Sequence, residues 1–140
     1  MQRKIRFFLL FSLLLFIPNG IQAFDIGRGL VDSLNNLPEP RLIYPVKETA
    51  VLSGGNNLEF KWGGEYAVTV DHYDFRLYKG YNTLADNLLL KEQLPRDTNT
   101  IAVGSDKFTD GQVYTWTLRQ VSLSGVKSDP SSNSFKVIKK

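Results

Sequence analysis

Residues 110–137 read DGQVYTWTLRQVSLSGVKSDPSSNSFKV, and this stretch decides the fold class. Tyr114, Trp116 and Leu118 alternate with Thr115, Thr117 and Arg119. A period of two predicts a β-strand with one buried face and one exposed face. The Asp-Gly before this strand and the Ser-Gly and Asp-Pro after it are typical of turns, and Phe135 and Val137 begin a second strand. The stretch therefore predicts two neighbouring strands joined by a turn.

Further strand patterns recur upstream at short intervals, separated by Gly, Asn, Asp and Pro. Together with the two strands above they give seven predicted strands, at residues 41–44, 58–62, 73–78, 88–94, 98–103, 113–122 and 134–139. Seven short strands with almost no helix favour an all-β protein, a seven-stranded antiparallel immunoglobulin-like sandwich.

The alternation also predicts which side chains form the core. These are mostly aromatic or branched: Leu58, Phe60, Trp62, Tyr73, Phe75, Leu77, Ile101, Val103, Tyr114, Trp116, Leu118, Phe135 and Val137. Large buried rings remove much apolar surface from water, which a sandwich without disulfides needs. The chain has no cysteine, so thiol catalysis and thiolate metal sites are excluded.

The amino terminus has the layout of a secretory signal peptide. Three basic residues, Arg3, Lys4 and Arg6, precede an apolar run at residues 7–17, and small residues lead to Ala23. The run is too short for a stable bilayer-spanning helix, which needs roughly 20 residues. We expect cleavage near Ala23 and a secreted or periplasmic protein without a transmembrane span; an uncleaved anchor is the alternative.

The charge of the predicted mature chain argues against nucleic acid as a partner. Of the 17 Lys and Arg residues, three precede Ala23, which leaves 14 to match the 14 Asp and Glu residues. A neutral chain without a basic cluster lacks the charge that phosphate backbones attract.

Residues 24–39 lie between the predicted signal peptide and the predicted domain, which covers residues 40–140. The apolar residues of the segment follow an approximately helical spacing, and a Pro-Glu-Pro sequence ends it; they are Ile26, Leu30, Val31, Leu34 and Leu37. A linker and a short amphipathic helix both fit this pattern. A helix of this length needs a surface on which to dock, on its own domain, on a partner or on a membrane.

Residues 110–137 resemble the last two strands of a fibronectin type III domain of bacterial secreted proteins. The resemblance extends upstream to Leu-Glu-Phe-Lys-Trp at residues 58–62 and Tyr-Asp-Phe-Arg-Leu-Tyr at residues 73–78, and covers about residues 40–140. It implies a noncatalytic scaffold for binding or spacing. It also places Tyr114 at the tyrosine corner, with its hydroxyl bonded to the backbone near Phe108 or Thr109.

The sequence offers little for catalysis or metal binding. His72 is the only histidine, and the strand pattern turns it outward beside Asp74, where a solvated strand end is the simplest interpretation. One histidine without a second nitrogen or sulfur ligand gives no established metal spacing. The chain has neither a Gly-x-Ser-x-Gly motif nor a glycine-rich phosphate loop. We therefore predict no catalytic residue, no cofactor and no metal.

Candidate binding residues lie at and after the end of residues 73–78. Tyr78 and Tyr81, with Asn82 beside them, are able to stack on a sugar or a peptide. The alternative is structural: Tyr78 packs across its strand and Tyr81 braces its own loop. Exposed strand edges offer a second route, because a partner can add a strand there.

The predicted function is that of a secreted, noncatalytic interaction or structural module of a bacterial cell envelope, with an envelope protein or a polysaccharide as partner. A carbohydrate-binding module is one alternative, and a small hydrolase with an unrecognised carboxylate pair is another. The pattern leaves the oligomeric state open. It places function in the segments that depart from the family pattern: residues 24–40, residues 78–87 and the strand edges.

Overall fold

A computed structural model describes residues 36–64 and 69–140. The predicted signal peptide, its cleavage near Ala23 and residues 24–35 of the helix-or-linker segment lie outside the described residues. The described end of that segment, residues 36–39, belongs to neither a helix nor a strand, and it buries Leu37.

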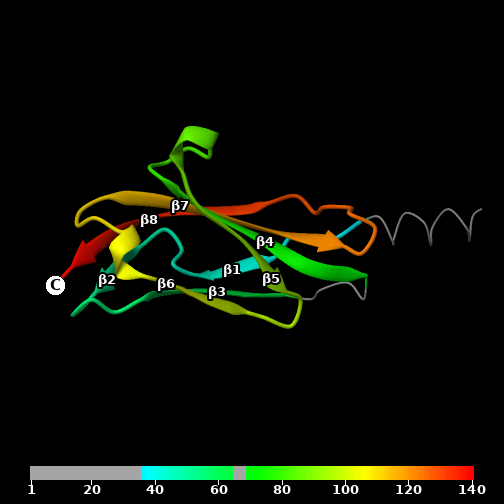
Figure 1. The fold of residues 1–140 in the computed structure, drawn as a ribbon, viewed down its shortest axis with the longest axis horizontal. Helices are drawn as coiled ribbons and strands as arrows, with labels where there is room; N and C mark the ends of the chain where they lie inside the picture. Colours follow the sequence, from blue (N-terminus) through cyan, green and yellow to red (C-terminus); the bar gives the residue numbers. More distant parts are fainter. Residues whose placement is uncertain (1–35, 65–68) are drawn as a thin grey trace, which may run out of the picture.

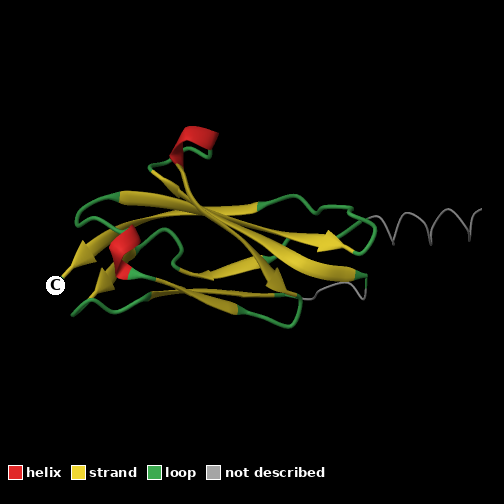
Figure 2. Cartoon of the chain, in the orientation of Figure 1, coloured by secondary structure: helices red, strands yellow, loops and turns green. Residues whose placement is uncertain are grey.

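Eight strands and two short 3-10 helices make up the described chain (Figures 1 and 2). The strands are β1 (Arg41–Tyr44), β2 (Thr49–Leu52), β3 (Leu58–Gly63), β4 (Val70–Lys79), β5 (Leu88–Pro95), β6 (Thr100–Val103), β7 (Val113–Ser122) and β8 (Ser131–Lys139). The 3-10 helices are η1 (Ala85–Asn87), between β4 and β5, and η2 (Ser105–Lys107), between β6 and β7.

The strands form two sheets that face each other in a sandwich. One sheet has the order β1-β3-β6, and the other has the order β2-β8-β7-β4-β5. Figure 1 shows the sandwich nearly edge-on, with β5 in front and the carboxyl terminus at one end. The all-β sandwich predicted from the sequence is thus confirmed at the level of its architecture.

The predicted strand count and the purely antiparallel pairing were wrong. The described residues hold eight strands, because β2 forms a four-residue strand that the sequence did not reveal. It pairs in parallel with β8, from Thr49 opposite Lys136 to Leu52 opposite Lys139, which makes the larger sheet mixed. A four-residue segment between turn-rich stretches is too short for a clear alternation, and its partner lies at the other end of the chain.

Two strands also begin at residues other than those predicted. β8 begins at Ser131 rather than Ser134, because its serine-rich start pairs with β7 in the register Leu118 opposite Ser131. β6 begins at Thr100, two residues later than predicted.

Aromatic rings fill the space between the sheets. The Phe60 ring lies 5.2 Å from Phe75, 5.1 Å from Trp116 and 5.6 Å from Phe135, each in an edge-to-face arrangement. Such pairs add about 0.5–1.5 kcal/mol each to the effect of area burial. All the predicted inward side chains are buried except Ile101, which is half-buried and packs against the cluster.

Two hydrogen bonds from core aromatics fix the connections between strands. The hydroxyl of Tyr114 accepts a bond from the backbone N–H of Thr109, 2.7 Å away, which confirms the expected tyrosine-corner contact. The indole Nε1 of Trp116 donates to the carbonyl of Pro45, 2.9 Å away. Side chains of β7 therefore hold both the segment that leads into β7 and the turn between β1 and β2.

Candidate functional site

The connection between β4 and β5 places the binding residues expected from the sequence. It begins at Gly80, whose φ of 84° favours glycine. The Gly80 N–H donates to the carbonyl of Val113 at 2.8 Å, and the Gly80 carbonyl accepts a bond from the Thr115 hydroxyl at 2.7 Å. These bonds fasten the start of the connection to β7, so that Tyr81 lies over the outer face of the larger sheet.

Tyr78 is not available as a binding residue. Only 5% of its surface is exposed. It lies on the outer face of the larger sheet, between Thr115 of β7 and Leu88 of β5. A hydrogen bond with Tyr78, together with the Asp74 carboxylate, raises the pKa of Arg76, while burial opposes the rise. Tyr78 is therefore a packing residue, as the structural alternative held.

Asn82 is engaged within its own loop. Its side-chain oxygen accepts a hydrogen bond from the Leu84 N–H at 3.4 Å and another from the Asn87 amide. The two contacts join the start of the connection to the end of η1. Asn82 thus shapes the loop that carries Tyr81.

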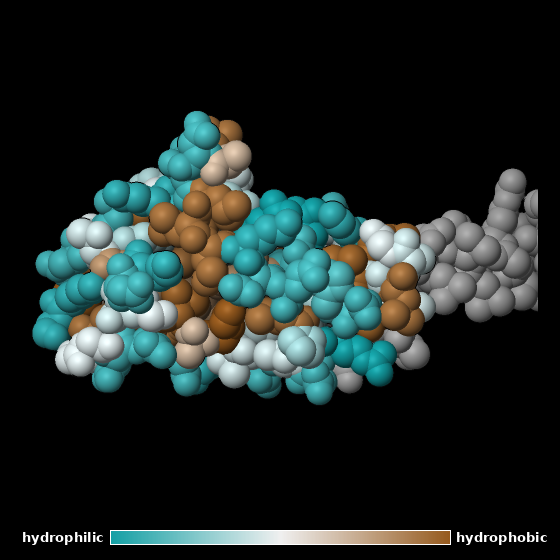
Figure 3. Space-filling view, viewed as in Figure 1, coloured by the Kyte–Doolittle hydropathy of each residue, from teal (hydrophilic) through white to brown (hydrophobic). Residues whose placement is uncertain are grey.

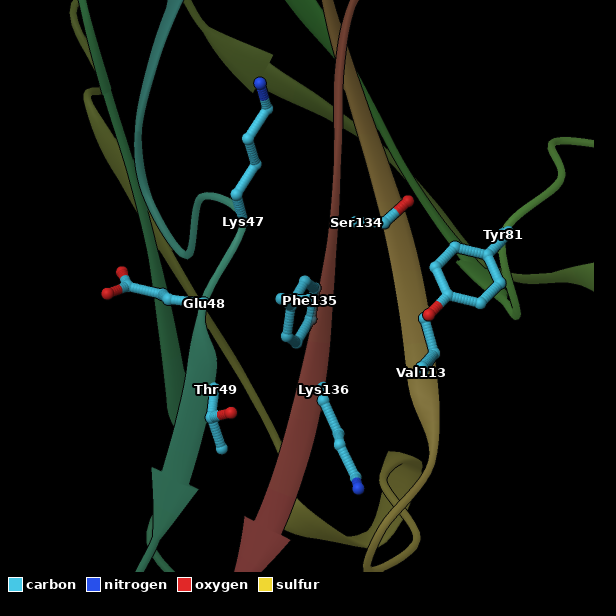
Figure 4. Close-up of a pocket in the computed structure, with 8 residues that line it drawn as sticks. All are labelled: Lys47, Glu48, Thr49, Tyr81, Val113, Ser134, Phe135 and Lys136. Carbon is cyan, nitrogen blue, oxygen red and sulfur yellow. The ribbon is translucent and has the colours of Figure 1, made fainter.

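Tyr81 projects into solvent, with 77% of its surface exposed, whereas Asn82 is exposed but bonded within its loop. It forms one wall of a hollow of about 350 Å³ on the outer face of the larger sheet (Figure 4). The hollow lies between the β2 and β7 sides of the sheet and is lined by Lys47, Glu48, Thr49, Tyr81, Val113, Ser134, Phe135 and Lys136. An aromatic wall beside hydroxyl groups suits the face and edge of a sugar ring.

The environment of His72 and Asp74 differs from the solvated strand end expected. The Nδ1 atom of His72 lies 2.8 Å from Oδ2 of Asp71, its neighbour in the sequence. Asp74 is only 5% exposed and lies 3.4 Å from the guanidinium of Arg76. It is buried because it lies in the middle of the sheet, opposite Gln93 of β5 and Arg119 of β7. Within the described ranges, no three His, Asp or Glu side chains gather as metal ligands.

A second surface follows the free edge of β5. Leu84 is 64% exposed, Leu88 and Leu89 are each 37% exposed, and Leu90 and Leu94 are half-buried. We call these five leucines the β5 edge surface. Figure 3 shows a hydrophobic area below the hairpin that carries η1, where β5 begins in Figure 1. Contiguous exposed apolar patches are a feature of interaction sites, which makes this surface a candidate.

The sequence pointed to exposed edges and to residues 78–87, but it did not single out the leucines. The run Leu88–Leu90 predicts a strand, and without the sheet order it gives no sign that the strand lies at an edge. A signal was nevertheless present: three consecutive leucines exceed what a strand with one buried face requires.

Comparison with known proteins supports the fold only. The sequence matches no known protein family and none of the curated proteins. Among solved structures, it is similar to part of a spore cortex lytic enzyme of Clostridium perfringens, with a TM-score of 0.54 and 16% identity over 76% of this chain. The match spans 30% of that enzyme's chain.

Two other solved structures align less closely. The fibronectin(III)-like modules of CbhA from Clostridium thermocellum give a TM-score of 0.48 and 15% identity, covering 71% of this chain and 96% of theirs. A β-1,2-glucanase from Parabacteroides distasonis gives a TM-score of 0.45 and 14% identity, covering 73% of this chain and 13% of its own.

In the part of the chain that the structure describes, no helix has the length and hydrophobicity to cross a membrane.

Proposed function

We propose that this chain is a secreted, noncatalytic interaction module of a bacterial cell envelope, built on a fibronectin type III-like sandwich, and that it binds a protein partner through the β5 edge surface. The observation that carries the proposal is the exposure of Leu84, Leu88 and Leu89 at and just before the edge strand β5, beside the half-buried Leu90 and Leu94. Apolar side chains kept in water at an edge favour burial against a partner. Secretion is supported by the sequence of residues 1–23.

Site-specific photo-crosslinking tests this proposal. A photoreactive residue replaces Leu89, and in a matched control it replaces Leu123, an exposed leucine between β7 and β8. Expressed in its native envelope, the Leu89 probe should cross-link one and the same envelope protein in repeated experiments, whereas the Leu123 probe should not. Recovery of no specific protein, or of the same proteins from both probes, counts against the proposal.

A second candidate function is carbohydrate binding in the Tyr81 hollow. The exposed Tyr81 ring beside Ser134 and Thr49 favours it. A glycan array and sedimentation with peptidoglycan test this candidate. Binding should be lost in Tyr81→Ala and kept in Tyr81→Phe, because stacking needs the ring and not the hydroxyl. Binding that Tyr81→Ala leaves unchanged would exclude this site.

The noncatalytic assignment can be overturned independently. A screen against hydrolase substrates is expected to show no turnover by the purified full chain. Turnover that disappears when a single carboxylate is replaced would instead support the hydrolase alternative.

A further inference from the structure

β5 is the longest of the four strands at sheet edges in the described chain. The sheet orders place β1 and β6 at the edges of one sheet and β2 and β5 at the edges of the other. β5 has 8 residues, whereas β1, β2 and β6 have 4 each. On the side away from β4, its backbone N–H and C=O groups are open to another strand. β5 is thus the edge best able to pair with an added segment.

The pairing of β5 with β4 fixes the face to which each β5 side chain belongs. Leu90 lies opposite Leu77, and Leu94 lies opposite Tyr73, so both face the core side. Glu92 lies between them and opposite Phe75, a buried ring. The edge therefore presents a carboxylate flanked by two leucines on the core side of the sheet.

Lys91 faces the opposite side of the sheet from Glu92, and the residue across from it on β4 is also positively charged. It lies on the outer face of the sheet, opposite Arg76. Within residues 36–64 and 69–140, neither Lys91 nor Glu92 takes part in an ion pair. β4 thus supplies an opposite charge to neither residue, and a strand on the free side of β5 is able to supply both.

We propose that β5 accepts an extended segment of a protein partner as an added antiparallel strand, with a basic residue opposite Glu92, an acidic residue opposite Lys91 and apolar residues opposite Leu90 and Leu94. The inference rests on the proposed function and specifies the class of partner. The backbone groups of β5 provide the pairing, and the two charges select the sequence and the register. An apolar strand without the basic residue is rejected, because it would bury Glu92 without a partner.

The same charges disfavour a second copy of this chain as the occupant in the registers centred on them, and registers centred on Leu90 or Gln93 set Glu92 opposite a leucine. Two β5 strands that pair around a two-fold axis place residues of the same face opposite each other. A register centred on Lys91 sets two lysines face to face, and a register centred on Glu92 sets two glutamates face to face. Like charges directly opposite each other destabilise a strand pair.

Two peptides of equal composition test the proposal. The first, blocked at both ends, contains Val-Thr-Lys-Glu-Val, which places Lys opposite Glu92 and Glu opposite Lys91 in the antiparallel register. The second contains Val-Thr-Glu-Lys-Val. The purified full chain should bind the first about tenfold more tightly in fluorescence anisotropy. Hydrogen exchange should slow at the backbone amides of β5 and not at those of β2.

A reversed protein provides the matched control. The double variant Lys91→Glu, Glu92→Lys should prefer the second peptide, because both charges are then exchanged; circular dichroism checks that its fold is unchanged. Equal affinity for both peptides, an unchanged preference in the reversed variant, or slowed exchange at another edge would overturn the proposal. The proposal would also be overturned if sedimentation showed that both the unchanged chain and the reversed variant form dimers. If a partner cross-links at Leu89 but neither peptide binds, the β5 edge surface is still a binding surface, and strand addition is excluded.

Discussion

Two tryptophans occupy equivalent depths in the core and differ in the partner of the indole nitrogen. Trp116 donates to the Pro45 carbonyl. Trp62 is also buried, but within the described residues its Nε1 has no hydrogen-bond partner. A buried donor without a partner costs about 1–3 kcal/mol. The two rings therefore contribute differently to stability although their burial is alike.

Replacement by phenylalanine should reveal this difference. Trp116→Phe leaves the Pro45 carbonyl without its donor, whereas Trp62→Phe removes a donor that was already unsatisfied. We expect Trp116→Phe to lower the free energy of unfolding by about 1–3 kcal/mol more than Trp62→Phe, because both lose similar ring area. Urea unfolding followed by circular dichroism measures this. Equal losses would show that the indole of Trp62 is satisfied in solution.

Tyr44, at the end of β1, provides a pH-dependent term. Burial raises the pKa of its phenol, Glu48 raises it further, and Lys61 opposes them. In the unfolded chain the phenol has its ordinary pKa, near 10. Because the folded pKa is the higher one, the contribution of Tyr44 to stability is fully present below about pH 10 and is lost as pH rises through the folded value. The melting temperature of Tyr44→Phe should therefore fall less steeply between pH 9 and pH 11 than that of the unchanged chain. Thermal melts at a series of pH values measure this, and equal slopes for the two chains would contradict the assignment.

At the scale of strands, alternation decided how much of the fold the sequence could predict. β3 and the first half of β7 carry large apolar side chains at every second position, and β7 has the predicted bounds. The sequence did not predict β2, because its two buried residues, Ala50 and Leu52, are too few to show a period. Its pairing with β8 depends on tertiary contact between distant segments. The candidate site was predictable only in part for the same reason, since sheet order decides that Tyr78 is covered and that β5 is an edge.

Glu92 illustrates how an edge strand avoids unwanted pairing. A charge on the core side of an edge disfavours association with any apolar strand. Glu92→Leu should therefore promote self-association of the chain, because it joins Leu90 and Leu94 into a continuous apolar face. Gln93→Leu is the matched control, because that residue lies on the outer face opposite Asp74. Sedimentation velocity over a range of concentrations should show association for Glu92→Leu only, and similar association of both variants would argue against a role for Glu92 in protecting this edge.

At the scale of the whole molecule, the ring cluster around Phe60 joins the two sheets. Phe60 belongs to β3, while Phe75, Trp116 and Phe135 belong to three strands of the other sheet. The chain has no cysteine, so packing supplies what disulfides provide in many secreted domains. A core shared in this way requires the two sheets to unfold together.

The two tryptophans allow this requirement to be measured, because Trp62 lies in β3 of one sheet and Trp116 in β7 of the other. The variant Trp116→Phe leaves fluorescence that reports on the smaller sheet, and Trp62→Phe leaves fluorescence that reports on the larger one. In each variant the fluorescence transition in urea should coincide with the transition in circular dichroism, as for a two-state domain. Adding Phe60→Ala should cost about 3–5 kcal/mol in either background, because the ring contacts both sheets. Leu123→Ala, at an exposed site, should change stability by less than about 0.5 kcal/mol. A fluorescence transition that precedes the circular dichroism transition in one background alone would mean that this sheet unfolds first and that Phe60 does not couple the two.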